Sequence, residues 1–138
     1  PTVPGFPIHT SLDLARMWNL MRDPWHDRGC HLSFVVIDAK GVPRPYPLDI
    51  DVTPVPDADR LAMVLDILID MLALLAPGGS VAVGLIVPDR NDCDRSLVDG
   101  WLSVMNAQLA ARDLAAWPVF FGDGAHMAPA CPSLSTVA

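Results

Sequence analysis

Residues 42–52 constrain the fold more than any other segment, because prolines occupy alternate positions in their first half. Pro43, Pro45 and Pro47 are two residues apart, and larger side chains alternate with them. In a β-strand, residues of the same parity direct their backbone groups to the same side, and proline has no N–H group to donate. The segment can therefore pair on one side only, and we expect it to be the edge strand of a sheet.

A strand that can pair with this edge comes directly before it. Residues 32–37 form an apolar run rich in β-branched side chains, which favours a buried strand. The sequence Asp-Ala-Lys-Gly at 38–41 is typical of a turn and reverses the chain. The two segments therefore predict an antiparallel hairpin at the edge of the sheet.

The longest apolar segment, residues 61–76, predicts a helix that the Pro-Gly-Gly sequence at 77–79 ends. Its sixteen residues span about 24 Å as a helix, less than the ~30 Å hydrocarbon core of a bilayer, so we expect no membrane span. Asp59, Asp66 and Asp70 fall on one narrow stripe, and every other direction is apolar. We expect this helix to be more deeply buried than an ordinary surface helix, with apolar surface left for a partner.

The rest of the chain alternates helices and strands. Thr10 and Asp13 form a capping-box pattern before a first helix. Ser96 and Asp99 form a second such pattern before a third helix. The two remaining strands are expected at residues 80–87 and 116–121.

These elements predict one α/β domain with the order α-β-β-α-β-α-β. Helices should cover both faces of a mixed sheet of about four strands, as a three-layer sandwich. The domain is expected to cover residues 10–126. Prolines at 1–9 predict an extended arm before it, and residues 127–138, which lack periodicity, predict a loose tail after it.

The charge of the chain argues against nucleic acid as a direct ligand. The formal net charge is −7, and the sequence contains no cluster of lysine and arginine. All 16 acidic residues are aspartate, so the chain contains no glutamate. Hydrophobic residues make up 51% of the sequence, a share that favours association with another protein surface.

The three cysteines, Cys30, Cys93 and Cys131, are far apart and include no C-x-x-C pair. Their odd number and wide spacing argue against a disulfide framework and against a zinc knuckle. No signal-peptide pattern is visible. These features fit a reducing compartment, and we therefore expect a cytoplasmic location.

Two local sequences give the chain a resemblance to a known family. A predicted strand ends in Leu-Ile-Val-Pro at 85–88, and the next helix opens with Ser-Leu-Val-Asp at 96–99. With the element order over about residues 32–124, this resembles the RadC-like branch of the JAB/MPN metallopeptidase-like domains, whose topological cousins are the cytidine deaminases. In the RadC-like pattern the strand ends in His-x-His-Pro, and the aspartate of Ser-x-x-Asp is the third metal ligand.

The resemblance implies a fold that has lost its catalytic site. The two metal-binding histidines of the family fall on Leu85 and Val87, whose aliphatic side chains cannot bind zinc. The catalytic glutamate of both families has no counterpart, because the chain contains no glutamate. The deaminases' Pro-Cys-x-x-Cys pair has only Cys93 as a counterpart. We therefore expect no enzymatic activity, no metal and no cofactor.

An acidic loop leaves two alternatives open. Carboxylates that follow a central strand can ligate Mg²⁺ or Ca²⁺, which would suit a metal-dependent hydrolase. A pocket beside the same loop would suit a small-ligand sensor. The same residues also suit a structural role, as helix caps and as favourable charges at a helix N-terminus. The possible ligand loop comprises Asp89, Asp92, Asp94, Ser96 and Asp99.

Other reactive side chains lack partners in the sequence. His26, His31 and His126 show no metal-binding or acid–base spacing, so we expect them at the surface. Cys93 and Ser96 could act as nucleophiles near a helix N-terminus, but no base accompanies either. We therefore assign none of them a catalytic role.

The leading interpretation is a non-catalytic module that binds protein, either as a homo-oligomer or with a foreign partner. The apolar helix at 61–76 and neighbouring aromatic residues would supply the surface. Trp101 has core spacing in its helix, whereas Trp25 follows an Asp-Pro turn and better suits an exposed anchor. Neither nucleic acid nor a membrane is an expected partner. The expected partner-binding residues are Trp25, Met63, Ile67, Ile69 and Leu74.

Overall fold

The computed structural model of the chain describes residues 3–21, 29–87, 95–123 and 126–130. Within them three helices and five strands follow the order α-β-β-α-β-α-β-β, which confirms the α/β class and the order of the first seven elements. No helix in these residues is long and apolar enough to cross a membrane. The elements are α1 (Ser11–Leu20), β1 (His31–Ile37), β2 (Leu48–Asp51), α2 (Ala58–Leu75), β3 (Ser80–Ile86), α3 (Arg95–Ala111), β4 (Phe120–Gly122) and β5 (Met127–Pro129).

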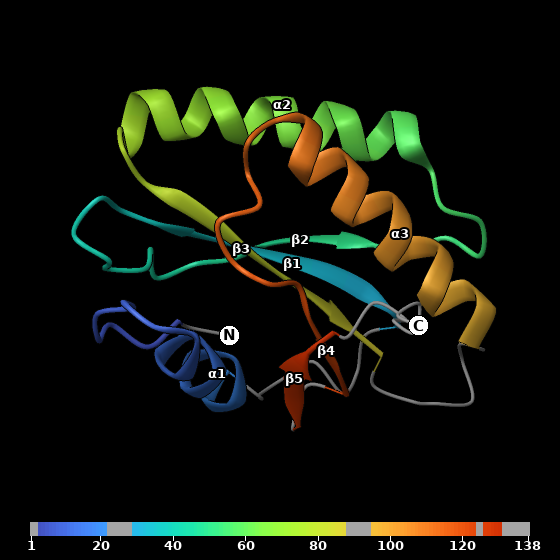
Figure 1. Ribbon diagram of the computed structural model, residues 1–138, viewed down its shortest axis with the longest axis horizontal. Coiled ribbons are helices and arrows are strands. Elements are labelled where there is room, and N and C mark those ends of the chain that lie inside the picture. The colour runs from blue at the N-terminus through green and yellow to red at the C-terminus, as the bar shows by residue number, and fades with distance from the viewer. Residues whose placement is uncertain (1–2, 22–28, 88–94, 124–125, 131–138) are drawn as a thin grey trace, which may run out of the picture.

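The five strands form one mixed sheet in the order β2-β1-β3-β4-β5. β1 runs antiparallel to both of its neighbours, β3 runs parallel to β4, and β5 returns antiparallel to β4. α2 and α3 cover one face of the sheet, and α1 lies on the other (Figure 1). The molecule therefore has three layers, with a hydrophobic core on each side of the sheet.

The alternation of side chains along β1 and β3 separates the two cores. Phe34 and Val83 belong to the core beneath α2 and α3, which we call the first core. Val35 and Ala82 belong to the core beneath α1, which we call the second core. Both central strands are consequently buried on both faces, as their continuous apolar sequences predict.

β2 is the edge strand that the prolines predict. The N–H group of Arg44 donates to the carbonyl oxygen of Val36 in β1 at 2.7 Å. Neighbours along a strand direct their backbone groups to opposite sides. The backbone nitrogen atoms of Pro43 and Pro45 are therefore on the outward side. The missing N–H groups are therefore missing from the free edge, where they would otherwise invite another strand.

The regular part of the edge strand is shorter than the predicted strand at 42–52. The residue pairs Phe34–Leu48 and Ile37–Pro43 show that β1 advances from 34 to 37 while the returning chain uses 43 to 48. The extra residues on the returning side interrupt the ladder where the prolines lie. β2 therefore begins only at Leu48.

The N-terminal arm lies along the proline segment. The N–H group of Val3 donates to the carbonyl oxygen of Pro45 at 2.8 Å, and that of Ile8 donates to Gly41 at 2.7 Å. Both donor residues bury their side chains in the second core. Residues 3–9 therefore contain no helix or strand, yet they are packed against the domain and cover part of its free edge.

The two predicted capping boxes differ in outcome. In α1 the Thr10 hydroxyl accepts from the Asp13 N–H group at 3.1 Å, and the Asp13 carboxylate accepts from the Thr10 N–H group at 3.2 Å. The second capping box is wrong, because α3 begins at Arg95 and Ser96 therefore lies inside its first turn. Asp99 instead pairs with Arg95 one turn away.

β5 corrects the expected loose tail from residue 127 and raises the number of strands to five. The Asn19 side chain holds its first residue, donating to the Met127 carbonyl oxygen at 3.0 Å and accepting from the Met127 N–H group at 2.9 Å. The sequence carried no signal for this contact, because the two residues are 108 positions apart. β4 also begins later than predicted, at Phe120. Residues 131–138 of the predicted tail lie outside the described residues.

A glycine in β3 brings α1 close to the sheet. A Cβ atom on Gly84 would lie 3.1 Å from two ring carbons of Trp18, closer than side-chain packing normally allows. Trp18 is fully buried, and its ring centre lies 6.4 Å from that of Phe120 in β4. The indole of α1 is therefore seated directly on the backbone of β3.

Gly84→Val should lower the free energy of unfolding by about 1–3 kcal/mol, because the added carbons must displace the buried indole of Trp18. Gly5→Val is the matched control, since no atom lies within 4 Å of a Cβ atom placed there. Denaturant unfolding of both variants, followed by circular dichroism, measures the difference. Equal stability of the two variants would contradict the close packing of α1 on the sheet.

Acid should weaken the cap of α1 through Asp13. Hydrogen bonds from the N–H groups of His9 and Thr10 hold the pKa of this carboxyl below its ordinary value. Because the pKa is lowered in the folded state, the stabilisation is complete above the ordinary pKa and is lost as the pH falls through the folded pKa. The stability difference between the natural chain and Asp13→Asn should therefore shrink below about pH 4. Unfolding measured over a pH series checks this, and a difference constant down to about pH 2 would contradict it.

Candidate partner-binding surface

α2 carries large apolar side chains on its outer side as well as on its buried side. The exposed fractions of Met63, Ile67 and Leu74 are 59%, 49% and 81%, so these predicted partner-binding residues reach the surface. Ile69 is instead partly buried and packs against the first core. The fifth predicted residue, Trp25, lies outside the described residues.

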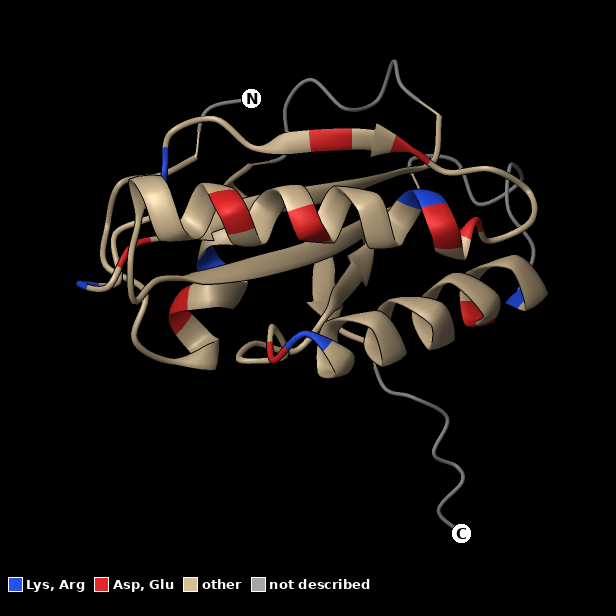
Figure 2. Cartoon of the chain, turned by 90° about the horizontal axis from the view of Figure 1, so that it is seen from above, with Lys and Arg blue, Asp and Glu red and all other residues tan. Residues whose placement is uncertain are grey.

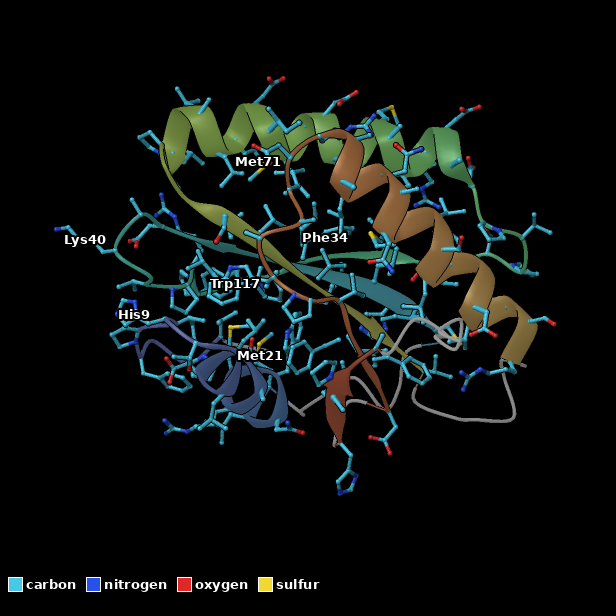
Figure 3. All side chains as sticks on the ribbon, viewed as in Figure 1. His9, Met21, Phe34, Lys40, Met71 and Trp117 are labelled. Carbon is cyan, nitrogen blue, oxygen red and sulfur yellow. The ribbon has the colours of Figure 1, made fainter. Side chains whose placement is uncertain are left out.

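The same apolar surface continues from α2 to the edge of the sheet. Met71 and Leu75 are exposed on α2, and Tyr46 and Leu48 are exposed at the edge strand. These four side chains line a cavity of about 80 Å³, together with the buried Phe34. Figure 3 labels Met71 on α2 and Phe34 below it at the sheet. We call the following seven residues the α2–β2 surface: Tyr46, Leu48, Met63, Ile67, Met71, Leu74 and Leu75.

The part of this surface on the edge strand was not among the predicted residues. Tyr46 and Leu48 have the same parity as Ile50 and Val52, which pack against the first core. The alternation could therefore have assigned them to the face that α2 covers. Only the position of α2 in the structure shows that they lie beside its exposed flank.

A row of aspartates borders the α2–β2 surface. Asp59, Asp66 and Asp70 are exposed along the outer side of α2, where Figure 2 shows acidic positions in red. The Asp66 carboxylate accepts from the guanidinium of Arg112 at 2.8 Å. Asp59 and Asp70 have no ion pair within the part of the chain that the structure describes. The border of the surface along α2 is therefore acidic.

Four polar residues, of which the sequence pointed only to His31, lie together on the opposite face of the sheet. His31 and Ser33 in β1 are fully buried. The strand register places Asp51 opposite His31 and Asp49 opposite Ser33. The signal was an alternation of polar and apolar residues in both strands, which identifies a shared face only after the strands are paired.

These four residues do not form a nucleophile–base pair. Ser33 and His31 are two apart in β1, so their Cα atoms are separated by about 7 Å. The Nδ1 atom of His31 lies 3.0 Å from the carbonyl oxygen of Gly29. The Ser33 hydroxyl is buried and makes no hydrogen bond within the described residues. The arrangement therefore lacks the contact that would activate Ser33 for nucleophilic attack.

Ser33→Ala should leave the free energy of unfolding unchanged or raise it by up to ~1 kcal/mol, because the buried hydroxyl has no hydrogen bond to lose. Ser80→Ala is the contrasting variant, since the Ser80 hydroxyl accepts from the Trp117 indole at 2.8 Å and its loss should cost about 1 kcal/mol. Thermal unfolding of both variants measures the difference. A clear loss of stability in Ser33→Ala would show that its hydroxyl has a partner.

Of the five residues of the possible ligand loop, the structure describes only Ser96 and Asp99. Ser96 is exposed in the first turn of α3, and the Asp99 carboxylate lies 3.2 Å from the guanidinium of Arg95. No group of three His, Cys, Asp or Glu side chains that could hold a metal ion occurs among the described residues. The loop residues outside the described residues are Asp89, Asp92 and Asp94.

The zinc site of the resembled families does not fit the residues present. Leu85 and Val87, at the positions of the two histidines, are buried in the first core. Their aliphatic side chains provide no ligand atom, and their packing leaves no polar site for an ion. No catalytic step through a metal can be derived from these positions.

A second cavity lies beside the N-terminal half of α3 and has a volume of about 190 Å³. Its lining is largely apolar, including Phe121 and Pro129, and Arg95 lies at its border. Pockets for small organic ligands are usually larger, from roughly 300 Å³ upward. This cavity would therefore hold only a small ligand or part of one.

The structure corrects two expectations about reactive side chains. His31 is buried in the sheet rather than at the surface, whereas His126 is exposed as expected. Cys30 is disulfide-bonded, although the spacing of the cysteines argued against disulfides. Distance along the sequence is a poor guide to which residues are close in space. For example, β1 pairs with β3, so His31 lies opposite Ile86. The residues of these types outside the described residues are His26, Cys93 and Cys131.

Comparison of the sequence with protein-family models, with curated proteins and with solved structures finds no match. The resemblance to RadC-like domains therefore rests only on two local sequences and on the order of the elements. The surface and the cavities must be interpreted from their own chemistry.

Proposed function

We propose that the chain is a non-catalytic protein-interaction module that binds its partner through the α2–β2 surface. The observation that carries this proposal is the exposure of Met63, Ile67 and Leu74 on the outer side of α2. Single exposed apolar residues are ordinary, but a continuous patch of them is typical of a contact with another protein. Here the patch also adjoins a cavity, which suits the insertion of a partner's side chain.

The shape of the surface suits a partner helix or a similar apolar ridge. Met63, Ile67, Met71 and Leu74 follow one another at spacings of three or four residues. They therefore form one line along α2, roughly 16 Å long. A second helix laid along this line would cover these side chains by ordinary ridge-into-groove packing.

The non-catalytic character is supported by the residues that are missing. The chain contains no glutamate, which both resembled families require beside their zinc ion. Leu85 and Val87 occupy the positions of two metal ligands and are buried in the first core. Under this proposal the chain keeps a JAB/RadC-like or deaminase-like arrangement of elements and uses it for binding.

A small-ligand sensor is a second candidate, favoured by the cavity beside α3. Arg95 lines this cavity and would suit an anionic group on the ligand, which would compete with the Asp99 carboxylate for the guanidinium. A thermal-shift screen of small carboxylates and phosphates should then find a stabilising ligand whose effect Arg95→Ala removes.

No such observation favours the metal-dependent hydrolase, because the Asp99 carboxylate pairs with Arg95. Stoichiometric metal in the purified protein, lost in Asp99→Ala, would revive it.

We also propose a cytoplasmic location, and the Cys30 disulfide counts against it, because disulfides are rare in a reducing cytoplasm. Thiol labelling of the chain in acid-quenched cells tests this location, because it counts the cysteines that are not in a disulfide. Labelling of all three cysteines would support the cytoplasm. Labelling of a single cysteine would contradict it.

A neutral amphipathic peptide is a direct probe of the α2–β2 surface. Such a helical peptide carries leucine along one face and glutamine elsewhere. Its titration into the labelled chain should shift the methyl signals of Met63, Ile67, Leu74 and Leu48. Ile67→Gln should weaken binding at least about tenfold, because it removes the central apolar contact. Shifts confined to other residues would contradict the proposed surface.

The same substitution should barely affect the folded chain. Ile67 is half exposed, so Ile67→Gln should change the free energy of unfolding by less than about 0.5 kcal/mol. Leu68→Ala at the next position is the contrast, since Leu68 is fully buried and the substitution should cost about 2–5 kcal/mol. Weaker peptide binding in a stable Ile67→Gln variant therefore reports on the surface and not on folding.

A further inference from the structure

We infer that the partner of the α2–β2 surface is a basic amphipathic segment, whose apolar face covers the surface and whose lysine or arginine side chains meet the carboxylates of α2. This inference rests on the proposed function and adds the chemistry of the partner. Its basis is that the apolar line and the row of aspartates run along the same helix, whose acidic positions are red in Figure 2.

The aspartates lie beside the apolar line on α2 and not on the opposite side. At about 100° per residue, Asp59 and Asp70 fall roughly 40° and 20° from Met63 around the helix axis. The buried residues, such as Leu61 and Leu68, lie on the other side of the helix. A partner helix along the apolar line would therefore bring its flank over both carboxylates.

The charges of these two carboxylates are not balanced within the described part of the chain. Asp66 pairs with Arg112 at 2.8 Å, whereas Asp59 and Asp70 have no ion pair there. Both side chains belong to exposed residues and can remain hydrated in the free chain. A cation on the partner would gain a favourable contact with them and would steer the approach of the partner.

A second copy of the chain would be a poor occupant of the surface. Each copy carries a formal net charge of −7, and Arg60 is the only cation on α2. Arg44 lines the cavity of the surface, and its guanidinium keeps its positive charge although it donates to the carbonyl oxygen of Leu75 at 2.7 Å. Self-association would bring acidic surfaces together with few cations between them, whereas a basic partner turns this repulsion into attraction.

Three peptides with the same leucine face separate the apolar part of recognition from the charged part. Their other face carries glutamine, lysine or glutamate. Fluorescence anisotropy measures their binding to the full 138-residue chain at low salt and at about 0.3 M salt. The lysine peptide should bind at least about tenfold more tightly than the glutamate peptide at low salt, and added salt should reduce this ratio.

Charge-neutral variants locate the preference on α2. Asp59→Asn combined with Asp70→Asn should reduce the preference for the lysine peptide about fivefold and leave the glutamine peptide unaffected. Asp99→Asn combined with Asp113→Asn is the charge-matched control, since both residues are exposed and lie outside α2. The control should change the preference by less than about twofold.

The possible results separate this inference from the proposed function. Equal affinity for the lysine and glutamate peptides, with binding still lost in Ile67→Gln, would overturn the basic partner alone. Peptide binding that Ile67→Gln leaves unchanged would overturn both. A dimer of the chain by itself, seen by sedimentation and lost in Ile67→Gln, would make a second copy the occupant and would also overturn the basic partner.

Discussion

The missing N–H groups of the prolines at 43, 45 and 47 close one side of the sheet, and the arrangement of the other elements follows from this. The bond from Arg44 to Val36 leaves the backbone nitrogen atoms of Pro43 and Pro45 facing outward, and the N–H group of Val3 in the N-terminal arm donates to the carbonyl oxygen of Pro45. A further strand can therefore join the hairpin only beside β1, and this strand is β3. α2, which connects β2 to β3, consequently crosses over β1 at the rim of the sheet.

The α2–β2 surface is a consequence of this crossing. The buried side of α2 packs on the first core through leucines such as Leu65 and Leu72. Its flank toward the edge has only a short strand beside it, because the ladder of β2 begins at Leu48. No further strand lies beyond β2 in the described chain, so Met71 and Leu75 border solvent and a small cavity. The feature that protects the sheet edge thus leaves the helix above it uncovered.

Much of the architecture could be predicted from the sequence, because its signals are local. The capping box of α1 and the end of α2 near Gly78, which has a φ of 79°, depend on residues a few positions apart. Trp101 is buried at core spacing, as predicted, and its indole donates to the carbonyl oxygen of Thr53 at 2.8 Å. The predictions failed where contacts between distant segments determine the structure. One example is β5, which the Asn19 side chain holds by hydrogen bonds to Met127.

The sequence by itself determined the α/β class and the edge position of the proline strand, but it predicted a more deeply buried α2 than the structure shows, since Met63, Ile67 and Leu74 are exposed. Periodicity and the chemistry of proline depend on neighbours in the chain, so a single sequence is enough to read them. Only the tertiary structure decided that Tyr46 and Leu48 join this surface, and that polar residues of β1 and β2 share one face of the sheet. These groupings depend on strand register and on where α2 crosses the sheet, which pairing between distant residues determines.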